Sequence, residues 1–248
     1  MPRSSPASPD VGRTFGRVAD AYDRLRPEYP AAAVDRAVAE LGLGRESDVL
    51  DLAAGTGKLT RALATRVGHV IAVEPDDEMR AFLDGDVRPG AAERIPVGDG
   101  EVDAVFVGDA FTWFDPGQAL VEIVRVLKPG GGLALLWRDW YQREEPPLPE
   151  QVRELLTELY MRFRAGSPPA GDWRDDIAGS PFGPLGHAAF EERSTISGHD
   201  LAELELTRSS PAALEDEERA LLAARIRPLM AAEYALTVVT TVDWATLR

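Results

Sequence analysis

Hydrophobic residues follow two alternating patterns through the middle of this 248-residue chain. Short, continuous apolar runs are typical of strands covered on both faces, and apolar residues three and four positions apart are typical of amphipathic helices. The runs predict strands at residues 48–52, 69–73, 102–107 and 132–137, with a weaker strand at 86–88. The periodic segments predict helices at 58–66, 76–82 and 118–127. Elements in this order predict an α/β fold with a doubly wound, mostly parallel sheet.

The flanking segments differ from this core, which we place at residues 31–138. Residues 1–12 contain three prolines and three serines without periodicity, so we expect a disordered tail. Residues 13–30 predict a helix closed by a proline-rich turn. After the core, composition and periodicity predict an insertion at 139–186 with an amphipathic helix at 151–164, then a C-terminal part at 187–248 with strands at 190–196 and 234–242 and a helix at 212–232.

Composition narrows the classes of function. The net charge is −15, whereas nucleic-acid-binding proteins usually carry a basic surface, so we expect no nucleic-acid partner. The chain has no cysteine, and its three histidines at 69, 187 and 199 are too scattered to suggest a metal site. No segment approaches the ~20 apolar residues of a membrane span, and the N-terminus lacks an apolar signal core. We therefore expect a cytoplasmic protein with no metal and no membrane contact.

The turn between the first core strand and its helix carries the strongest chemical signal. The strand ends at Asp51 and is followed by the small-residue loop Ala53–Gly57, and the next strand ends in Glu74. Glycine lets a ligand approach the backbone, and an acid at the tip of the next strand can accept hydrogen bonds from two ribose hydroxyls. The pattern predicts a site for a nucleoside cofactor.

The choice of cofactor depends on further residues. A P-loop requires a Ser or Thr after Lys58 and an earlier glycine, and both are missing. The nicotinamide pattern requires Gly or Ala where Thr60 stands, although Glu74 would also suit NAD, so the glycine loop alone leaves the cofactor open. Asp51 is poorly placed for a pyrophosphate and suits a cationic amino group. Ala91–Pro96 can meet an adenine edge.

Together with the helix-to-strand turn Arg125–Gly132, these motifs resemble class I S-adenosylmethionine-dependent methyltransferases over roughly residues 15–137. The similarity is greatest to the small-molecule subgroup that includes trans-aconitate methyltransferase, which often carries a tyrosine followed by Arg-Pro-x-Tyr-Pro, as at Tyr22 and Arg26–Pro30. That subgroup also often carries Gln-Ala-Phe-His-Trp-Phe. Here Asp109–Phe114 has Asp for Gln and Thr112 for His, and Ala53 replaces a common glycine.

The resemblance implies a seven-stranded Rossmann-like sheet whose last two strands pair antiparallel, a lid at residues 13–30 and a helical cap insertion at 139–186. It also implies S-adenosyl-L-methionine as the cofactor. Asp51 would hold its amino group directly or through water, Arg26 its carboxylate and Glu74 its ribose. The complete set implied for the cofactor is Tyr22, Arg26, Asp51, Ala53, Gly55, Thr56, Gly57, Glu74, Pro75, Met79, Ala92, Glu93, Asp109 and Ala110.

For the acceptor, aromatic residues near the strand ends and the lid suggest a small, partly apolar molecule. These residues are Tyr29, Phe111, Trp113, Trp137, Trp140 and Tyr141. We expect O-, N- or carboxylate methylation, for example in secondary metabolism. No catalytic base is identified, since Thr112 is a poor base. The main alternative is a methyltransferase-fold protein that uses the cofactor as a scaffold for a cyclisation or rearrangement, because fold alone does not determine chemistry.

Overall fold

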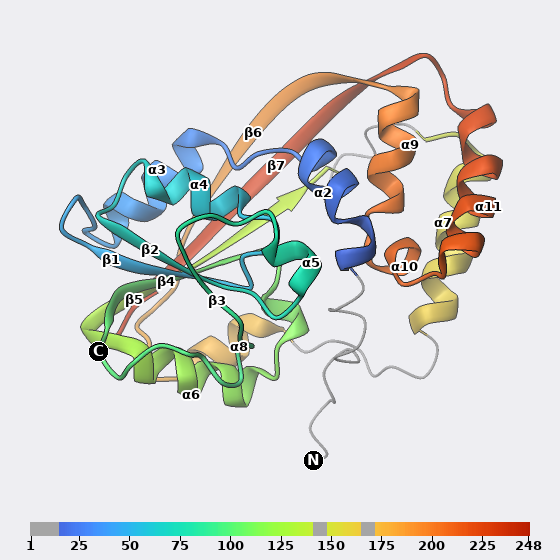
Figure 1. The fold of residues 1–248 in the computed structure, drawn as a ribbon. Coiled ribbons are helices and arrows are strands. Elements are labelled where there is room, and N and C mark those ends of the chain that lie inside the picture. The colour runs from blue at the N-terminus through green and yellow to red at the C-terminus, as the bar shows by residue number, and fades with distance from the viewer. Residues whose placement is uncertain (1–14, 141–147, 165–171) are drawn as a thin grey trace.

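A seven-stranded sheet forms the centre of the computed structural model, which describes residues 15–140, 148–164 and 172–248 (Figure 1). The strand order is β3-β2-β1-β4-β5-β7-β6. Strands β1 to β5 pair in parallel, and β7 pairs antiparallel with both β5 and β6. The strands are β1 Asp48–Leu52, β2 His69–Val73, β3 Asp86–Arg88, β4 Val102–Gly108, β5 Leu127–Asp139, β6 Gly186–Ser197 and β7 Glu233–Thr246. The predicted fold class, including the antiparallel final pair, is confirmed.

Helices cover both faces of the sheet. Helices α3 and α4 lie on one face, and α6 and α8 lie on the other (Figure 1). The helices are η1 Phe15–Val18, α2 Ala19–Leu25, α3 Ala31–Glu40, α4 Lys58–Ala64, α5 Asp77–Arg80, η2 Phe111–Trp113, α6 Pro116–Val126, α7 Glu150–Arg164, α8 Trp173–Ala178, α9 Gly198–Leu206, α10 Ser209–Ala212, α11 Asp216–Ile226 and η3 Arg227–Leu229. In none of the described segments is a helix both long enough and apolar enough to cross a membrane.

The two-sided burial explains why the central strands are continuously apolar. Val49 packs in the core under α3 and α4, whereas its neighbour Leu50 packs in the core under α6, and both are fully buried. Successive side chains of a strand point to opposite faces, so each face requires apolar residues of its own. The same applies to Val105 and Phe106 of β4.

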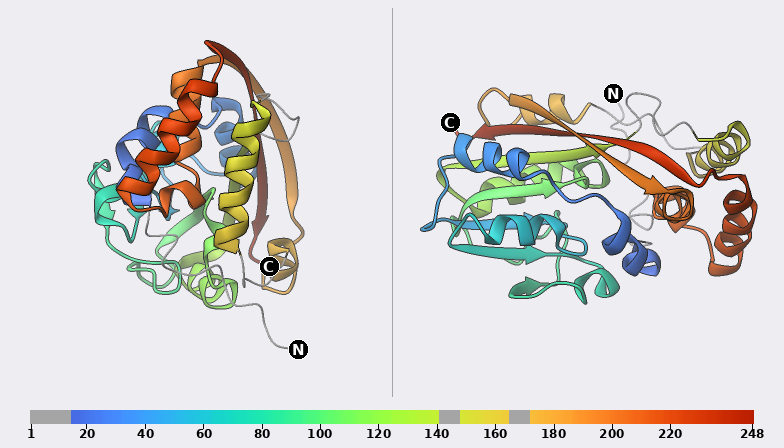
Figure 2. Two further views of the ribbon diagram at one scale, coloured as in Figure 1. Left: turned by 90° about the vertical axis from the view of Figure 1, so that its right-hand side faces the viewer. Right: turned by 90° about the horizontal axis from the view of Figure 1, so that it is seen from above.

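The segment after the core is organised differently from the expected insertion at 139–186. Strands β6 and β7 extend well beyond the parallel strands, and a helical cluster of α7, α9, α10 and α11 packs around their far ends (Figure 2). By contrast, α8 packs beside α6, where Ile177 is fully buried. Helix α9, which Ser197 caps by accepting a hydrogen bond from the Asp200 N–H at 3.0 Å, was not predicted. The expected helix at 212–232 is shorter in the structure, where α11 spans Asp216–Ile226 and is followed by η3, which contains Pro228.

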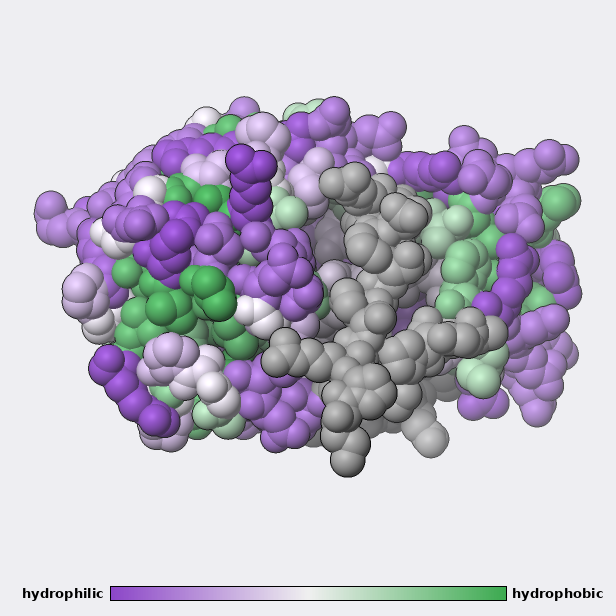
Figure 3. Space-filling model, turned by 90° about the horizontal axis from the view of Figure 1, so that it is seen from below, coloured by the Kyte–Doolittle hydropathy of each residue, from purple (hydrophilic) through white to green (hydrophobic). Residues whose placement is uncertain are grey.

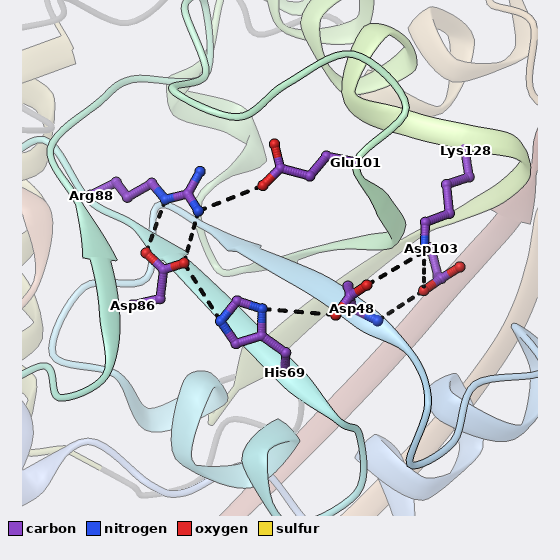
Figure 4. Close-up of polar contacts among 7 residues, drawn as sticks. All are labelled: Asp48, His69, Asp86, Arg88, Glu101, Asp103 and Lys128. Atoms are coloured by element: carbon purple, nitrogen blue, oxygen red, sulfur yellow. Dashed lines mark hydrogen bonds and ion pairs between the residues drawn. The ribbon is translucent and has the colours of Figure 1, made fainter.

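Ionisable side chains contact one another at the amino ends of the strands. His69, at the start of β2, lies between Asp48 of β1 and Asp86 of β3, with nitrogen–oxygen distances of 3.8 and 3.5 Å (Figure 4). Lys128 pairs with Asp103 at 2.9 Å. Such half-exposed pairs each contribute about 0–1 kcal/mol to stability. This arrangement leaves the opposite, carboxyl ends of the strands for ligands, as in other open α/β sheets.

The outer surface is mostly hydrophilic, in agreement with the net charge of −15. Figure 3 shows the face on which α6 and α8 lie, where purple side chains surround a large green, apolar area and further green side chains lie toward the right-hand edge. Val121 of α6 is 67% exposed.

Candidate functional site

A cavity of about 910 Å³ lies at the carboxyl ends of the parallel strands. Its size is near the upper end of the ~300–1,000 Å³ usual for ligand sites. It is bounded by the loops after β1, β2, β4 and β5, by α2, and by the start of α10. Fourteen of the residues expected at the site line it: Tyr22, Arg26, Ala53, Gly55, Glu74, Pro75, Met79, Ala92, Glu93, Asp109, Ala110, Trp113, Trp137 and Trp140.

The loop after β1 turns sharply beneath the cavity. Ala53, Gly55 and Gly57 have φ values of +59°, +58° and +86°, in the left-handed region that favours glycine. A Cβ on Gly57 would lie 2.5 Å from Leu83 Cδ2, so only glycine fits there without a shift. Ala53 and Gly55 reach the cavity surface, whereas Thr56 and Gly57 are not among its lining residues and support the loop from behind.

Glu74 links this loop to the end of β2. One carboxylate oxygen accepts the Gly55 N–H at 2.8 Å and the other accepts the Asp76 N–H at 2.9 Å. The side chain is buried apart from the part that lines the cavity, and this burial raises its pKa. Each oxygen has a further lone pair, so the carboxylate can still accept hydrogen bonds from a ligand.

Asp51 lies directly under the loop rather than on the cavity surface. It is 1% exposed, and its Oδ2 accepts a hydrogen bond from Thr60 Oγ1 at 2.6 Å. Burial raises its pKa from 3.8 to about 7, the Thr60 hydrogen bond opposes this, and the nearby Glu74 charge adds to it. An acid with this pKa is poised to become charged when a cation approaches.

The loop after β3 and the start of α5 form the next part of the wall. Ala92 and Met79 are each 3% exposed and pack as apolar surface. The carboxylate of Glu93 accepts the Asp115 N–H at 2.9 Å, just before α6 begins. Glu93 therefore ties the β3 loop to the segment that follows Trp113.

The aromatic residues expected around an acceptor divide into two groups. Trp113, Trp137 and Trp140 line the cavity. Phe111 is 2% exposed and packs in the core against Phe114 and Trp173, with ring centroids 5.6 and 6.3 Å away, and Tyr29 is buried behind Asp109. Neither is a lining residue in the structure. Tyr141 lies outside the described residues.

Arg26 brings a cation to the same cavity. Its Nε and Nη2 donate to the Oγ1 and carbonyl oxygen of Thr207 at 3.0 and 2.9 Å, and its guanidinium lies 4.6 Å from the Tyr22 ring. Burial lowers its pKa, and the nearby positive charges of Arg138 and Arg208 add to this effect. Among the described segments, no acidic side chain forms an ion pair with it. A desolvated guanidinium of this kind can bind a carboxylate.

Several lining residues were missed by sequence reasoning. Phe15 packs edge-on against Trp113, with centroids 6.0 Å apart, and was predicted only as one apolar position of a helix. Arg138 interrupts an apolar strand directly after Trp137, a signal that could have been used. Arg208 and Ser209 come from a segment with no predicted element, so nothing in the sequence indicated them.

Comparison with known proteins identifies the family. A family profile described as a methyltransferase domain matches residues 50–135. A methyltransferase-like protein of Schizosaccharomyces pombe, itself uncharacterised, is 34% identical over 215 residues, 84% of this chain and 82% of that protein. An uncharacterised methyltransferase of Mycobacterium tuberculosis is 46% identical over 133 residues, 52% of this chain and 53% of its own, so the match spans about half the length of that relative.

A solved structure supports the fold. A protein described as a type II methyltransferase from Anaeromyxobacter dehalogenans superposes with a TM-score of 0.59 over 90% of this chain and 97% of the other, at 22% identity. At that identity the similarity concerns the fold alone.

Proposed function

The chain belongs to the class I S-adenosylmethionine-dependent methyltransferases, and from this premise we propose that it methylates a small, partly apolar molecule bound beside the cofactor in the 910 Å³ cavity. The observation that carries the proposal is that two unlike sets of residues line one cavity. One set consists of acidic and glycine residues from the loops after β1 and β2, and the other consists of three tryptophans. The resemblance to the small-molecule subgroup supports the same choice, as does the net charge of −15, which disfavours nucleic acid.

The chemistry of the lining fits the cofactor. Glu74 would accept the ribose hydroxyls, while Ala92 and Met79 would provide apolar surface beside the adenine. The methionine end carries both an ammonium and a carboxylate. The chain offers a buried acid, Asp51, and a cation, Arg26, that forms no ion pair with the residues that the structure describes. Opposite charges are therefore available for both groups.

The cofactor supplies a sulfonium methyl group that is transferred by in-line displacement. The protein's part is alignment and exclusion of water, which can provide much of the rate acceleration. Trp113, Trp137 and Trp140 would hold the acceptor, and the contact between Phe15 and Trp113 would close the cavity from the side of η1. An acceptor that is already ionised needs no base, whereas a hydroxyl or amine acceptor must lose a proton.

Calorimetry with S-adenosylmethionine and its demethylated product tests the cofactor assignment. Glu74→Ala should weaken binding by about 1–3 kcal/mol because charge-assisted hydrogen bonds are lost. Glu40→Ala, on the exposed side of α3, is the matched control and should leave affinity unchanged. Tight binding of NAD with no binding of S-adenosylmethionine would contradict the proposal.

The acceptor assignment requires a separate assay. Release of the demethylated cofactor should be followed with a panel of small acceptors that differ in charge and apolar area. Turnover of any of them supports the proposal. Cofactor-dependent isomerisation of an acceptor without methyl transfer would instead support the scaffold alternative.

A further inference from the structure

Arg138, at the end of β5, forms the most heavily bonded ion pair at the cavity. Its side chain is 2% exposed, yet the residue lines the cavity. Its Nε and Nη2 contact Oδ2 of Asp109 at 2.7 and 2.6 Å, and its backbone N–H donates to Oδ1 at 2.7 Å. The hydroxyl of Tyr29 donates to the same Oδ2 at 3.1 Å. Burial opposes the charge of Arg138, but the adjacent carboxylate outweighs it and raises the pKa.

These contacts engage most of the acceptor capacity of the Asp109 carboxylate. Nε and Nη2 of Arg138 and the Tyr29 hydroxyl contact Oδ2, and the Arg138 backbone N–H contacts Oδ1. Asp109 also shapes the cavity through its backbone. Its φ is +55°, a left-handed conformation that costs a non-glycine residue about 1–2 kcal/mol. Such a conformation persists only where the surroundings hold it in place.

Arg138 also reaches the chain segment that follows α2. Its Nη1 donates to the carbonyl oxygen of Pro27, and its guanidinium lies 4.1 Å above the ring of Tyr29. Tyr22 and Arg26, which line the cavity, stand on the same stretch just before Pro27. One buried guanidinium thus connects the ends of β4 and β5 to the wall formed by α2.

We propose that Arg138 is a positioning residue: it holds the backbone of Asp109 in its left-handed conformation and fixes residues 27–29, so that Tyr22 and Arg26 are placed against the cofactor's methionine end. This inference rests on the proposed function. A purely structural role is the competing explanation, but buried ion pairs seldom add net stability compared with apolar packing. The pair lies between two walls of the cavity, and a role in holding these walls in position explains this location better than a role in stability does.

Two conservative variants test the role of Arg138. Arg138→Lys keeps the charge but cannot contact Asp109 and Pro27 together, and Tyr29→Phe removes only the hydroxyl that bonds Asp109. Binding of the demethylated cofactor is measured by calorimetry at least 20 °C below each variant's melting temperature, and hydrogen exchange is followed at residues 19–29. We expect at least tenfold weaker binding for Arg138→Lys, a smaller loss of the same sign for Tyr29→Phe, and faster exchange in both.

Arg36→Lys is the matched control, because Arg36 of α3 stacks on Trp244 at 5.4 Å away from the cavity. It should change neither affinity nor exchange at residues 19–29. Affinity within twofold of wild type for both test variants, with unchanged exchange, would overturn the inference. Should Arg138→Lys not fold, Tyr29→Phe decides alone. Failure of the wild-type protein to bind the cofactor would instead refute the proposed function.

Discussion

Substitution of Asp51 by Asn provides a stringent test of the site, because stability and binding should respond in opposite directions. Burial raises the pKa of Asp51 from 3.8 to about 7, so the folded protein holds a proton there that the unfolded chain has already lost. At about 1.4 kcal/mol per pKa unit, ionising this carboxyl in the folded state costs about 4 kcal/mol. This contribution of Asp51 to the free energy of unfolding is present in full below pH ~4 and is lost progressively as the pH rises through 7.

The Asn variant cannot ionise, yet its side-chain oxygen can still accept the Thr60 hydrogen bond. Without cofactor, it should be more stable than wild type, and its advantage should grow by about 2–3 kcal/mol between pH 5 and pH 8. Thermal or urea unfolding across this pH range measures the difference. An advantage that does not change with pH would show that Asp51 is already ionised in the folded protein at pH 5.

Cofactor binding should show the reverse preference. In the proposed site the ammonium group interacts with ionised Asp51, so wild-type affinity should fall about tenfold per pH unit below 7. It should also decline above about pH 8, where an α-amino group loses its proton. Calorimetry with the demethylated cofactor should find this profile in wild type, and weaker binding without the rise between pH 5 and 7 in Asp51→Asn. A flat wild-type profile, or equal profiles for the two proteins, would refute the assignment.

Two further substitutions test the walls of the cavity. Gly108→Ala places a Cβ 2.3 Å from Tyr29 Oη, so Tyr29 must move and its hydrogen bond to Asp109 is lost. We expect the free energy of unfolding to fall by ~1–3 kcal/mol, as measured by thermal unfolding, and cofactor binding to weaken. An unchanged melting temperature would contradict this expectation. Trp113→Ala should reduce turnover, or raise the Michaelis constant of the acceptor, with little change in cofactor affinity by calorimetry. Loss of cofactor binding in a folded Trp113→Ala protein would show that the tryptophan belongs to the cofactor end.

The glycine-loop half of the cavity was predictable because the signals are local. Each central strand is apolar on both faces, as Val49 and Leu50 illustrate. This pattern can be recognised in the sequence without knowing which strands pair. Glu74 and the Ala53–Gly57 loop follow directly from strand ends that the pattern locates. Ala53, Gly55 and Glu74 line one cavity because a parallel sheet brings its carboxyl ends together.

The C-terminal part was harder to predict because β6 is an edge strand. It pairs only with β7, and the predicted strand at 190–196 omitted its first four residues, Gly186–Ala189, which include no large apolar side chain. In the helical cluster, α7 and α9–α11 bury their apolar sides against one another and against the far ends of β6 and β7. No local pattern in the sequence specifies which helices share a core.

The other half of the cavity depends on pairs that are distant in sequence. Arg26 bonds to Thr207, 181 residues away, and Arg138 bonds to Pro27 and Asp109, 111 and 29 residues away. Hydrophobic periodicity records burial along one element and contains no information on such pairs. The residue type still gave a clue, because a charge inside an apolar strand must find a partner once it is buried. Asp109, directly after β4, supplies the matching charge for Arg138 inside β5.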